Sequence, residues 1–342
     1  MTEEQSSGPN VLKGRNISGW HPLDNQHCFL CGEVLAKENL SQEHVIPIWA
    51  QNKFNLWDKK LTLINRTEIP YRQLKVPCCK VCNNIHLAKL ENTIKPFALG
   101  QKNPADLPSE IAYQWCAKIL IAIIYKELQL PLDRSSLESE KIHSKDFLDE
   151  FSMCHFFLQS IRKPFQFHCL DSDFPASVFR FRTKTDQTDD DNFDLITNIM
   201  GQSIGIRIGQ LGLIVVCDGG LQELFKHDSP QKYGEHNLHP IQFREICAQI
   251  HYKAALRDAT HFYVISESPE VVSVNQIKIV PFSNELTEDG EMVVFKDWSQ
   301  RVYSHILGHF IGIDPSELYE ETTDRVNTFL KDDEGNFADL SI

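Results

Sequence analysis

Two pairs of cysteines with Cys-x-x-Cys spacing constrain the fold of this chain more than any other feature. Cys28 and Cys31 form the first pair and Cys79 and Cys82 the second, with 47 residues between the pairs. Four thiolates spaced in this way can hold one tetrahedral Zn²⁺, and such an ion stabilises a small unit that has little hydrophobic core of its own. Cys78 does not fit the spacing of a ligand pair, so we expect its side chain to point away from the metal.

An acid and a histidine lie between the two cysteine pairs. Residues 41–47 read SQEHVIP, so Glu43 directly precedes His44. A histidine in an apolar strand is often an ordinary core residue, and neighbouring side chains of a strand face opposite ways. The two side chains can therefore serve one centre only at a bend or at the end of a strand. Their place between the two halves of a zinc site favours a catalytic role.

The order Cys-x-x-Cys, Glu-His-Val-Ile-Pro, Cys-x-x-Cys-Asn resembles the zinc-stapled branch of the HNH endonuclease family over about residues 28–90. Members of that family fold as a ββα-metal finger and hydrolyse phosphodiester bonds with one divalent cation. The resemblance implies that His44 is the base that activates water and that Glu43 and Asn83 bind the cation. His86, one helical turn after Asn83, could be an additional ligand, or could pack or contact a phosphate.

The chemistry of phosphodiester hydrolysis agrees with this assignment. The reaction needs a base for the nucleophile and positive charge near the transition state. Carboxylate and amide oxygens are hard ligands that suit Mg²⁺ or Mn²⁺. We therefore expect a structural Zn²⁺ at the four cysteines and a catalytic Mg²⁺ or Mn²⁺ at Glu43, Asn83 and His86. In the family a middle asparagine holds the loop of the catalytic histidine; here Gln73 or Asn65 could do so, or the loop is braced otherwise.

Sequence patterns divide the chain into a small and a large part. Residues 1–19 are expected to form a disordered tail, 20–97 the HNH nuclease module, 98–108 a linker, and 109–342 an α+β domain of regulatory or sensor role. In the module we predict a short hairpin over 61–69 with its turn at Asn65, then a helix over 80–94.

The larger part mixes helical and strand patterns. Helices are predicted over 109–130, 241–257 and 298–311, and strands over 165–169, 177–181, 211–217, 262–265 and 276–280. The predicted fold class is α+β, with an N-terminal ββα-metal (HNH) zinc-finger module and a larger C-terminal mixed α+β domain.

Charge is unevenly distributed along the chain. The net charge is −13, but residues 1–100 carry 12 Lys and Arg against 9 Asp and Glu, so the other 242 residues carry −16. An acidic protein binds nucleic acid only where its basic residues are segregated. We expect the N-terminal module to face nucleic acid, DNA rather than RNA, with Arg72 and Lys75 as contacts.

The remaining patterns concern location. The first 19 residues lack the basic start and apolar stretch of a signal peptide. The longest apolar run, residues 119–125, is far shorter than the roughly 20 residues that span a bilayer. Scattered cysteines favour a reducing compartment. We expect a cytoplasmic protein that does not bind membranes.

The sequence thus predicts a metal-dependent DNA endonuclease, by family analogy a bacterial restriction or anti-phage effector. One alternative is a catalytically silent zinc-finger module that binds nucleic acid or protein. Another is an assembly protein that binds a protein partner or a second copy of itself through its acidic C-terminal domain. Metal-dependent nicking of DNA distinguishes the enzyme from both.

Overall fold

The computed structural model of the chain describes residues 10–13, 23–136, 138–143, 145–170, 172–186, 192–221, 229–283, 290 and 292–342. The α-helices of these residues are α1 (Ile48–Lys53), α2 (Ala88–Ala98), α3 (Ser109–Leu128), α4 (Lys145–Glu150), α5 (Ser152–Leu158), α6 (Pro240–Ala255), α7 (Gln300–Ile311) and α8 (Pro315–Leu318). A π-helical segment, Cys82–Leu87, runs directly into α2.

The strands form two larger sheets and three small ones. The four-stranded sheet has the order β1 (Asn10–Lys13), β12 (Ala259–Glu267), β13 (Val272–Pro281), β6 (Phe165–His168). The five-stranded sheet has the order β11 (Asn237–Leu238), β7 (Ser177–Thr183), β10 (Leu211–Val216), β9 (Ser203–Ile208), β8 (Phe193–Asn198). The small pairs are β2 (Leu40–His44) with β5 (Lys75–Cys79), β3 (Lys60–Thr62) with β4 (Glu68–Pro70), and β14 (Tyr319–Glu320) with β15 (Arg325–Val326).

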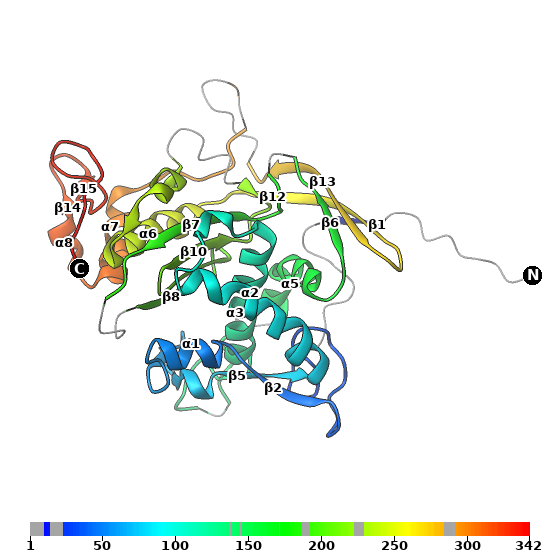
Figure 1. Ribbon diagram of the computed structural model, residues 1–342. Helices are drawn as coiled ribbons and strands as arrows, with labels where there is room; N and C mark the ends of the chain where they lie inside the picture. Colours follow the sequence, from blue (N-terminus) through cyan, green and yellow to red (C-terminus); the bar gives the residue numbers. More distant parts are fainter. Residues whose placement is uncertain are drawn as a thin grey trace, which may run out of the picture.

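The five-stranded sheet lies between α3 on one face and α6 on the other (Figure 1). Successive strand residues face opposite ways, so Leu211 and Leu213 of β10 join the core around α3, whereas Ile214 joins the core around α6. A Cβ at Gly212 would lie 2.8 Å from the ring of Phe243. Glycine at this strand position therefore allows α6 to approach the sheet closely.

The N-terminal unit has the order strand, strand, helix. β2 and β5 pair antiparallel, with Leu40 opposite Cys79 and His44 opposite Lys75, and the helix begins at Cys82. The long connection between β2 and β5 contains α1 and the β3–β4 hairpin. The predicted hairpin over 61–69 is confirmed, with Asn65 in its turn accepting a hydrogen bond from the Thr67 amide at 3.0 Å.

One hydrophobic core joins the N-terminal unit to α3 and to the five-stranded sheet. It includes Val45 and Ile46 after β2, Ile94 of α2 and most of α3. The segment predicted to be a linker, 98–108, contributes Ala98 and Leu107 to the same core. The two parts of the chain therefore pack directly on each other in the structure (Figure 1).

The predicted mixed α+β class is confirmed, and each helix and strand predicted for residues 109–342 has a counterpart. The sequence patterns missed β8 and β9. Of the predicted tail, only Asn10–Lys13 lies within the described residues, where it forms β1 and pairs with β12. The rest of residues 1–19 lies outside them.

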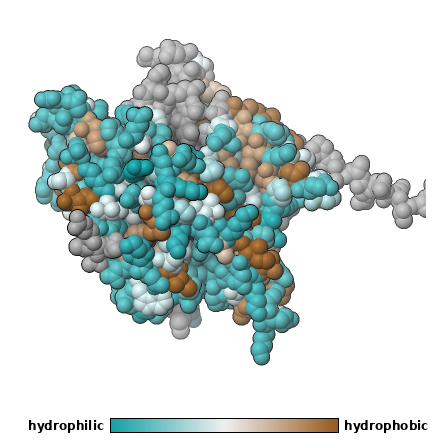
Figure 2. Space-filling model, viewed as in Figure 1, coloured by the Kyte–Doolittle hydropathy of each residue, from teal (hydrophilic) through white to brown (hydrophobic). Residues whose placement is uncertain are grey.

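Among the described helices, none is both long and apolar enough to cross a bilayer. On the face of the molecule in Figure 2, hydrophilic residues predominate and hydrophobic ones are divided among separate patches.

Candidate functional site

The four cysteines of the two Cys-x-x-Cys pairs come together at one end of the β2–β5 pair. Ligand atoms of Cys28, Cys31, Cys79 and Cys82 all lie within 4.8 Å of one another. Cys28, Cys79 and Cys82 are buried and Cys31 is half-buried. This is the only such group of acids, histidines and cysteines among the described residues.

The donor set fits Zn²⁺. Four sulfurs at about 2.3 Å from one ion in a tetrahedron are about 3.8 Å apart, and the Cys31 and Cys79 sulfurs are 3.8 Å apart. All four cysteines are free thiols. Burying several thiols together without a cation is unfavourable once any of them ionises, and a zinc ion removes this cost. The predicted structural zinc site is therefore compatible with the structure.

Local backbone geometry prepares both cysteine pairs for this role. After the first pair, Gly32 adopts a φ of 71°, a conformation that glycine tolerates, and its amide donates to the Cys28 carbonyl at 2.8 Å. In the second pair, the Cys82 amide points at the Cys79 sulfur from 3.4 Å. The Phe29 amide donates to the Pro77 carbonyl at 3.0 Å and so holds the two pairs together.

Cys78 lies beside the cluster without being part of it. Its sulfur is 3.8 Å from that of Cys28, but Cys78 does not belong to the group of four. This separation equals that of the Cys31 and Cys79 sulfurs, so the Cys78 side chain does not point away from the cluster as expected. The group of four is the expected ligand set, and Cys78 lies directly beside it.

Glu43 is held in a buried ion pair that the sequence did not predict. Lys118 Nζ, from the middle of α3, lies 2.5 Å from Glu43 Oε1 and 3.4 Å from Glu91 Oε1 of α2. Lys118 is fully buried and Glu43 is 4% exposed. Burial opposes the charged ammonium, but the two carboxylates outweigh it and raise the pKa of Lys118. For Glu91, burial disfavours the charged carboxylate and so raises its pKa to about 7.

This arrangement bears on the predicted catalytic cation. A divalent ion bound by Glu43 would compete with the Lys118 ammonium for the same carboxylate. The described residues form no acid, histidine and cysteine cluster around Glu43 that could hold a metal. The residues present therefore do not fit a catalytic Mg²⁺ or Mn²⁺ in the way they fit zinc, and that ion stays a prediction.

The same lysine braces the backbone that follows β2. Lys118 Nζ donates to the carbonyl oxygens of His44 at 2.9 Å and Val45 at 3.1 Å. Gln51 of α1, which is fully buried, donates from Nε2 to the Ile46 carbonyl at 2.7 Å. Three consecutive carbonyls are thus fixed by side chains from α3 and α1. From the sequence we expected bracing of the loop that carries His44 by Gln73 or Asn65, or by other groups.

Neither of the residues considered for that role makes these contacts. Asn65 instead donates to the Pro131 carbonyl at 2.8 Å, in the turn of the β3–β4 hairpin. Gln73 is exposed, just before β5. The loop is therefore braced otherwise, which was the third possibility left open by the sequence.

His44 ends β2 with a half-buried side chain. Burial lowers the pKa of its imidazole, the nearby Lys75 and Lys118 lower it further, and Glu43 opposes them. The ring is therefore mostly neutral at pH 7 and can accept a proton. His44 lies at the end of the strand, and Lys118 holds its backbone carbonyl.

Asn83 and His86 lie on the helix that follows the second cysteine pair. Asn83 Nδ2 donates to Ser41 Oγ at 2.7 Å and to the Gln42 carbonyl at 3.1 Å, so it packs against β2 next to Glu43. His86 lies near Ile161 and Arg162, and burial together with Arg162 lowers its pKa. The structure thus places Asn83 beside the Glu43 strand and His86 against a different part of the chain.

The two predicted nucleic-acid contacts differ in their surroundings. Arg72 forms an ion pair with Asp58 and donates to the Trp57 carbonyl at 3.2 Å. Lys75 lies directly across from His44 on the neighbouring strand and is half-buried. Of the two, Lys75 is the one placed to act near the histidine.

Lys118 and Gln51 are the site residues that the sequence analysis missed. A signal for Lys118 was present, because it interrupts the apolar residues 111–125 of a helix predicted to be buried. A lysine is almost never fully buried without a paired charge.

Comparisons of this chain with protein-family models, with curated proteins and with solved structures found no match.

Proposed function

We propose that this chain is a zinc-stapled endonuclease in which His44 acts as the general base for hydrolysis of phosphodiester bonds in DNA. The observation that carries the proposal is the neutral, half-buried His44 at the end of β2, in a strand, strand, helix unit built around four clustered cysteines. The resemblance of the same residues to the HNH family supports it.

In the proposed reaction, each of several side chains has a distinct role. His44 takes the proton from the attacking water. Lys118 and Gln51 hold the backbone that carries it, so that the imidazole keeps one orientation. Lys75, across the strand pair from His44, supplies positive charge for a phosphate. Asn83 fixes the helix against β2 through its bonds to Ser41 and Gln42.

The experiment is the nicking of supercoiled plasmid by the zinc-loaded full chain with Mg²⁺, with Mn²⁺ or with EDTA. His44→Ala should abolish nicking while zinc content and the unfolding transition stay as in the wild type. His86→Ala is the matched control, because the structure places this half-buried histidine against Ile161 and Arg162 and not beside Glu43, contrary to its expected role as a ligand. This variant should keep most of the nicking. Equal nicking by wild type and His44→Ala would refute the role of His44.

The assay also separates the competing function and tests the cation. DNA binding without nicking under all metal conditions would favour a silent zinc-finger binding module. Loss of nicking in EDTA, with zinc retained, would support a catalytic cation.

A further inference from the structure

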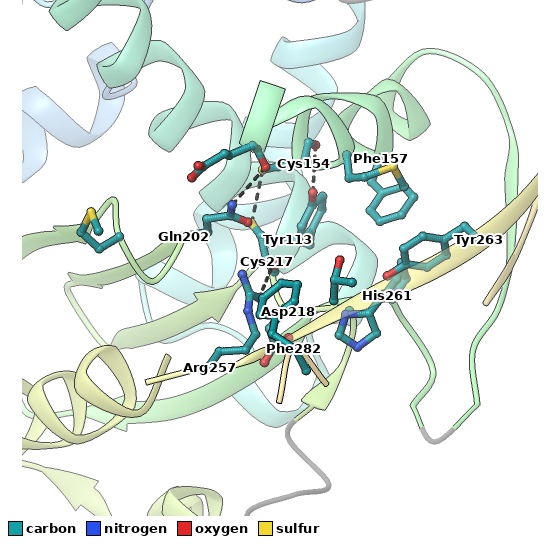
Figure 3. A pocket seen from close by; sticks show the side chains of 17 residues that line it. Tyr113, Cys154, Phe157, Gln202, Cys217, Asp218, Arg257, His261, Tyr263 and Phe282 are labelled. Atoms are coloured by element: carbon teal, nitrogen blue, oxygen red, sulfur yellow. Dashed lines mark hydrogen bonds between the residues drawn. The ribbon is translucent and has the colours of Figure 1, made fainter. Parts of the chain in front are cut away.

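A second group of reactive side chains lies far along the chain from His44, around a pocket of about 180 Å³. The pocket is lined by residues of α3, α5 and β12 and by the chain that follows β10 (Figure 3). Two free cysteines face each other there: Cys154 in α5 and Cys217 just after β10. Their sulfur atoms are 3.2 Å apart.

This distance is close to what a disulfide needs. An S–S bond is about 2.05 Å long, so the two sulfurs need to approach by only about 1 Å. Of the three other cysteines outside the zinc cluster and its neighbour Cys78, namely Cys116, Cys169 and Cys247, none has a sulfur partner among the described residues. Cys154 and Cys217 are thus the only paired thiols outside the zinc unit.

The surroundings of the pair favour reaction. Cys217 is half-buried and lines the pocket. Arg257 donates to the Cys217 carbonyl at 3.2 Å. The hydrogen bond from Cys217 lowers the pKa of Cys154 despite its burial, and Tyr113 adds to the effect. Positive charge and hydrogen bonds that stabilise a thiolate are what distinguish reactive cysteines from inert buried ones.

The hydrogen bond to Cys154, burial and Asp218 raise the pKa of Cys217, and Arg257 opposes them only in part, so the thiolate is favoured at Cys154. Asp218, which follows Cys217, is buried and accepts hydrogen bonds from the Ser177 amide and hydroxyl at 2.9 and 2.7 Å. Burial lowers the pKa of His261 to about 3, so this ring is neutral at pH 7.

We propose that Cys154 and Cys217 are an oxidative modification site, which a hydroperoxide converts into a reversible disulfide. One thiolate attacks the peroxide oxygen, the O–O bond breaks, and the sulfur becomes a sulfenic acid while water or an alcohol leaves. The second thiol then attacks that sulfur, the S–O bond breaks and water leaves. Both sulfurs are oxidised by one electron and the peroxide is reduced by two, so the balance closes. In a reducing compartment such a disulfide is transient and serves sensing.

The disulfide would tie α5 to the end of β10, and α5 in turn holds the zinc unit. His155, next to Cys154, bonds through Nε2 to the Phe29 carbonyl at 2.9 Å, and Gln159 Nε2 donates to the Leu30 carbonyl at 2.7 Å. Phe29 and Leu30 are the two residues between the cysteines of the first pair. Oxidation at the pocket therefore acts on the helix that positions the zinc-binding turn.

The test treats the zinc-loaded full chain with rising concentrations of hydrogen peroxide, blocks the remaining thiols and maps disulfides by peptide mass spectrometry. The expected result is a Cys154–Cys217 linked peptide that forms before any zinc is released and that dithiothreitol removes. Two fewer thiols should then be blocked, and the urea midpoint of unfolding should rise because the bond closes a long loop.

Two variants keep the test decisive. Cys217→Ser should abolish the linked peptide, whereas Cys169→Ser, which removes a half-buried cysteine without a sulfur partner, should leave it unchanged. The proposal is overturned if the wild type, whose folding is not in question, gives no linked peptide. It is equally overturned if the first disulfides form among the zinc cysteines with release of zinc. None of these readouts depends on nuclease activity.

Discussion

The ammonium group of Lys118 lies 2.5 Å from Oε1 of Glu43 and is itself fully buried. The lysine belongs to the central helix of the larger part of the chain, and the glutamate directly precedes the proposed catalytic base. Since the same ammonium also fixes the His44 and Val45 carbonyls, one side chain couples the packing of α3 to the position of His44. The larger domain thus helps to hold the backbone of His44 in place.

Replacing this lysine should be strongly destabilising. Lys118→Met leaves the buried carboxylate of Glu43 without a cation and two carbonyls without a donor. Breaking a buried ion pair from one side typically lowers the free energy of unfolding by about 3–5 kcal/mol. Urea denaturation of wild type and variant measures the loss.

Lys126→Met is the matched control, because Lys126 is a half-buried lysine of the same helix that forms no ion pair with the described residues. It should change the free energy of unfolding by less than about 1 kcal/mol. The double variant Glu43→Gln/Lys118→Met should be less destabilised than the sum of its single changes, because the charge that makes each one harmful is gone. Additive effects would mean that the two side chains do not interact.

The zinc ligand set predicts a sharp difference between neighbouring cysteines. Cys79→Ser removes one of four ligands and should lower bound zinc well below one per chain, with increased protease sensitivity of the N-terminal unit. Cys78→Ser, one residue earlier and outside the group of four, should keep one zinc per chain. Metal analysis of the purified variants measures both. Full zinc in Cys79→Ser would show that the ligand set is wrong.

How far the sequence could predict these features depends on whether their cause is local. Cysteine spacing is local, and so the zinc cluster was predictable. The apolar residues of 211–217 also revealed β10 directly. In contrast, β8 and β9 were missed because Asp194 and Arg207, opposite each other on these strands, form a buried ion pair of 2.5 Å. In the sequence, each charged residue predicts a solvent-exposed position. Burial of the two side chains becomes favourable only because their charges pair.

The same reason explains why the bracing of His44 was not predicted. In the sequence, Asn65 and Gln73 were the named candidates for this bracing. The donors are Gln51 and Lys118. Lys118 lies 74 positions after His44. Only the tertiary packing of α3 on the N-terminal unit brings it there.

Gln51 offers a test of bracing that is separate from the buried charge. Gln51→Leu keeps the size of the side chain but leaves the Ile46 carbonyl without its donor. An unsatisfied buried polar group should lower the free energy of unfolding by about 1–3 kcal/mol. If Gln51 positions His44, kcat for nicking should fall with little change in KM, and zinc content should stay at one per chain. Unchanged kcat would mean that Gln51 contributes to stability alone.

The C-terminal segment is joined to α6 by a buried acid. Glu245 of α6 is 1% exposed, and its carboxylate accepts hydrogen bonds from Thr328 Oγ1 at 2.6 Å and from the Phe329 amide at 2.7 Å. Burial raises its pKa from 4.5 to about 7, although both hydrogen bonds oppose the shift. In the folded chain the group is therefore mostly protonated at pH values where the unfolded chain is ionised.

This shift predicts an unusual pH dependence of stability. Between pH 4.5 and about 7 the folded state binds more protons at Glu245 than the unfolded state, so its contribution to stability is full below pH 4.5 and is lost as pH rises through 7. The free energy of unfolding of wild type minus that of Glu245→Gln should accordingly fall across this window, as measured by urea denaturation at a series of pH values. Thr328→Val removes a hydrogen bond that favours the carboxylate and should extend the fall to higher pH. A difference that instead rises with pH would show that Glu245 is ionised in the folded chain.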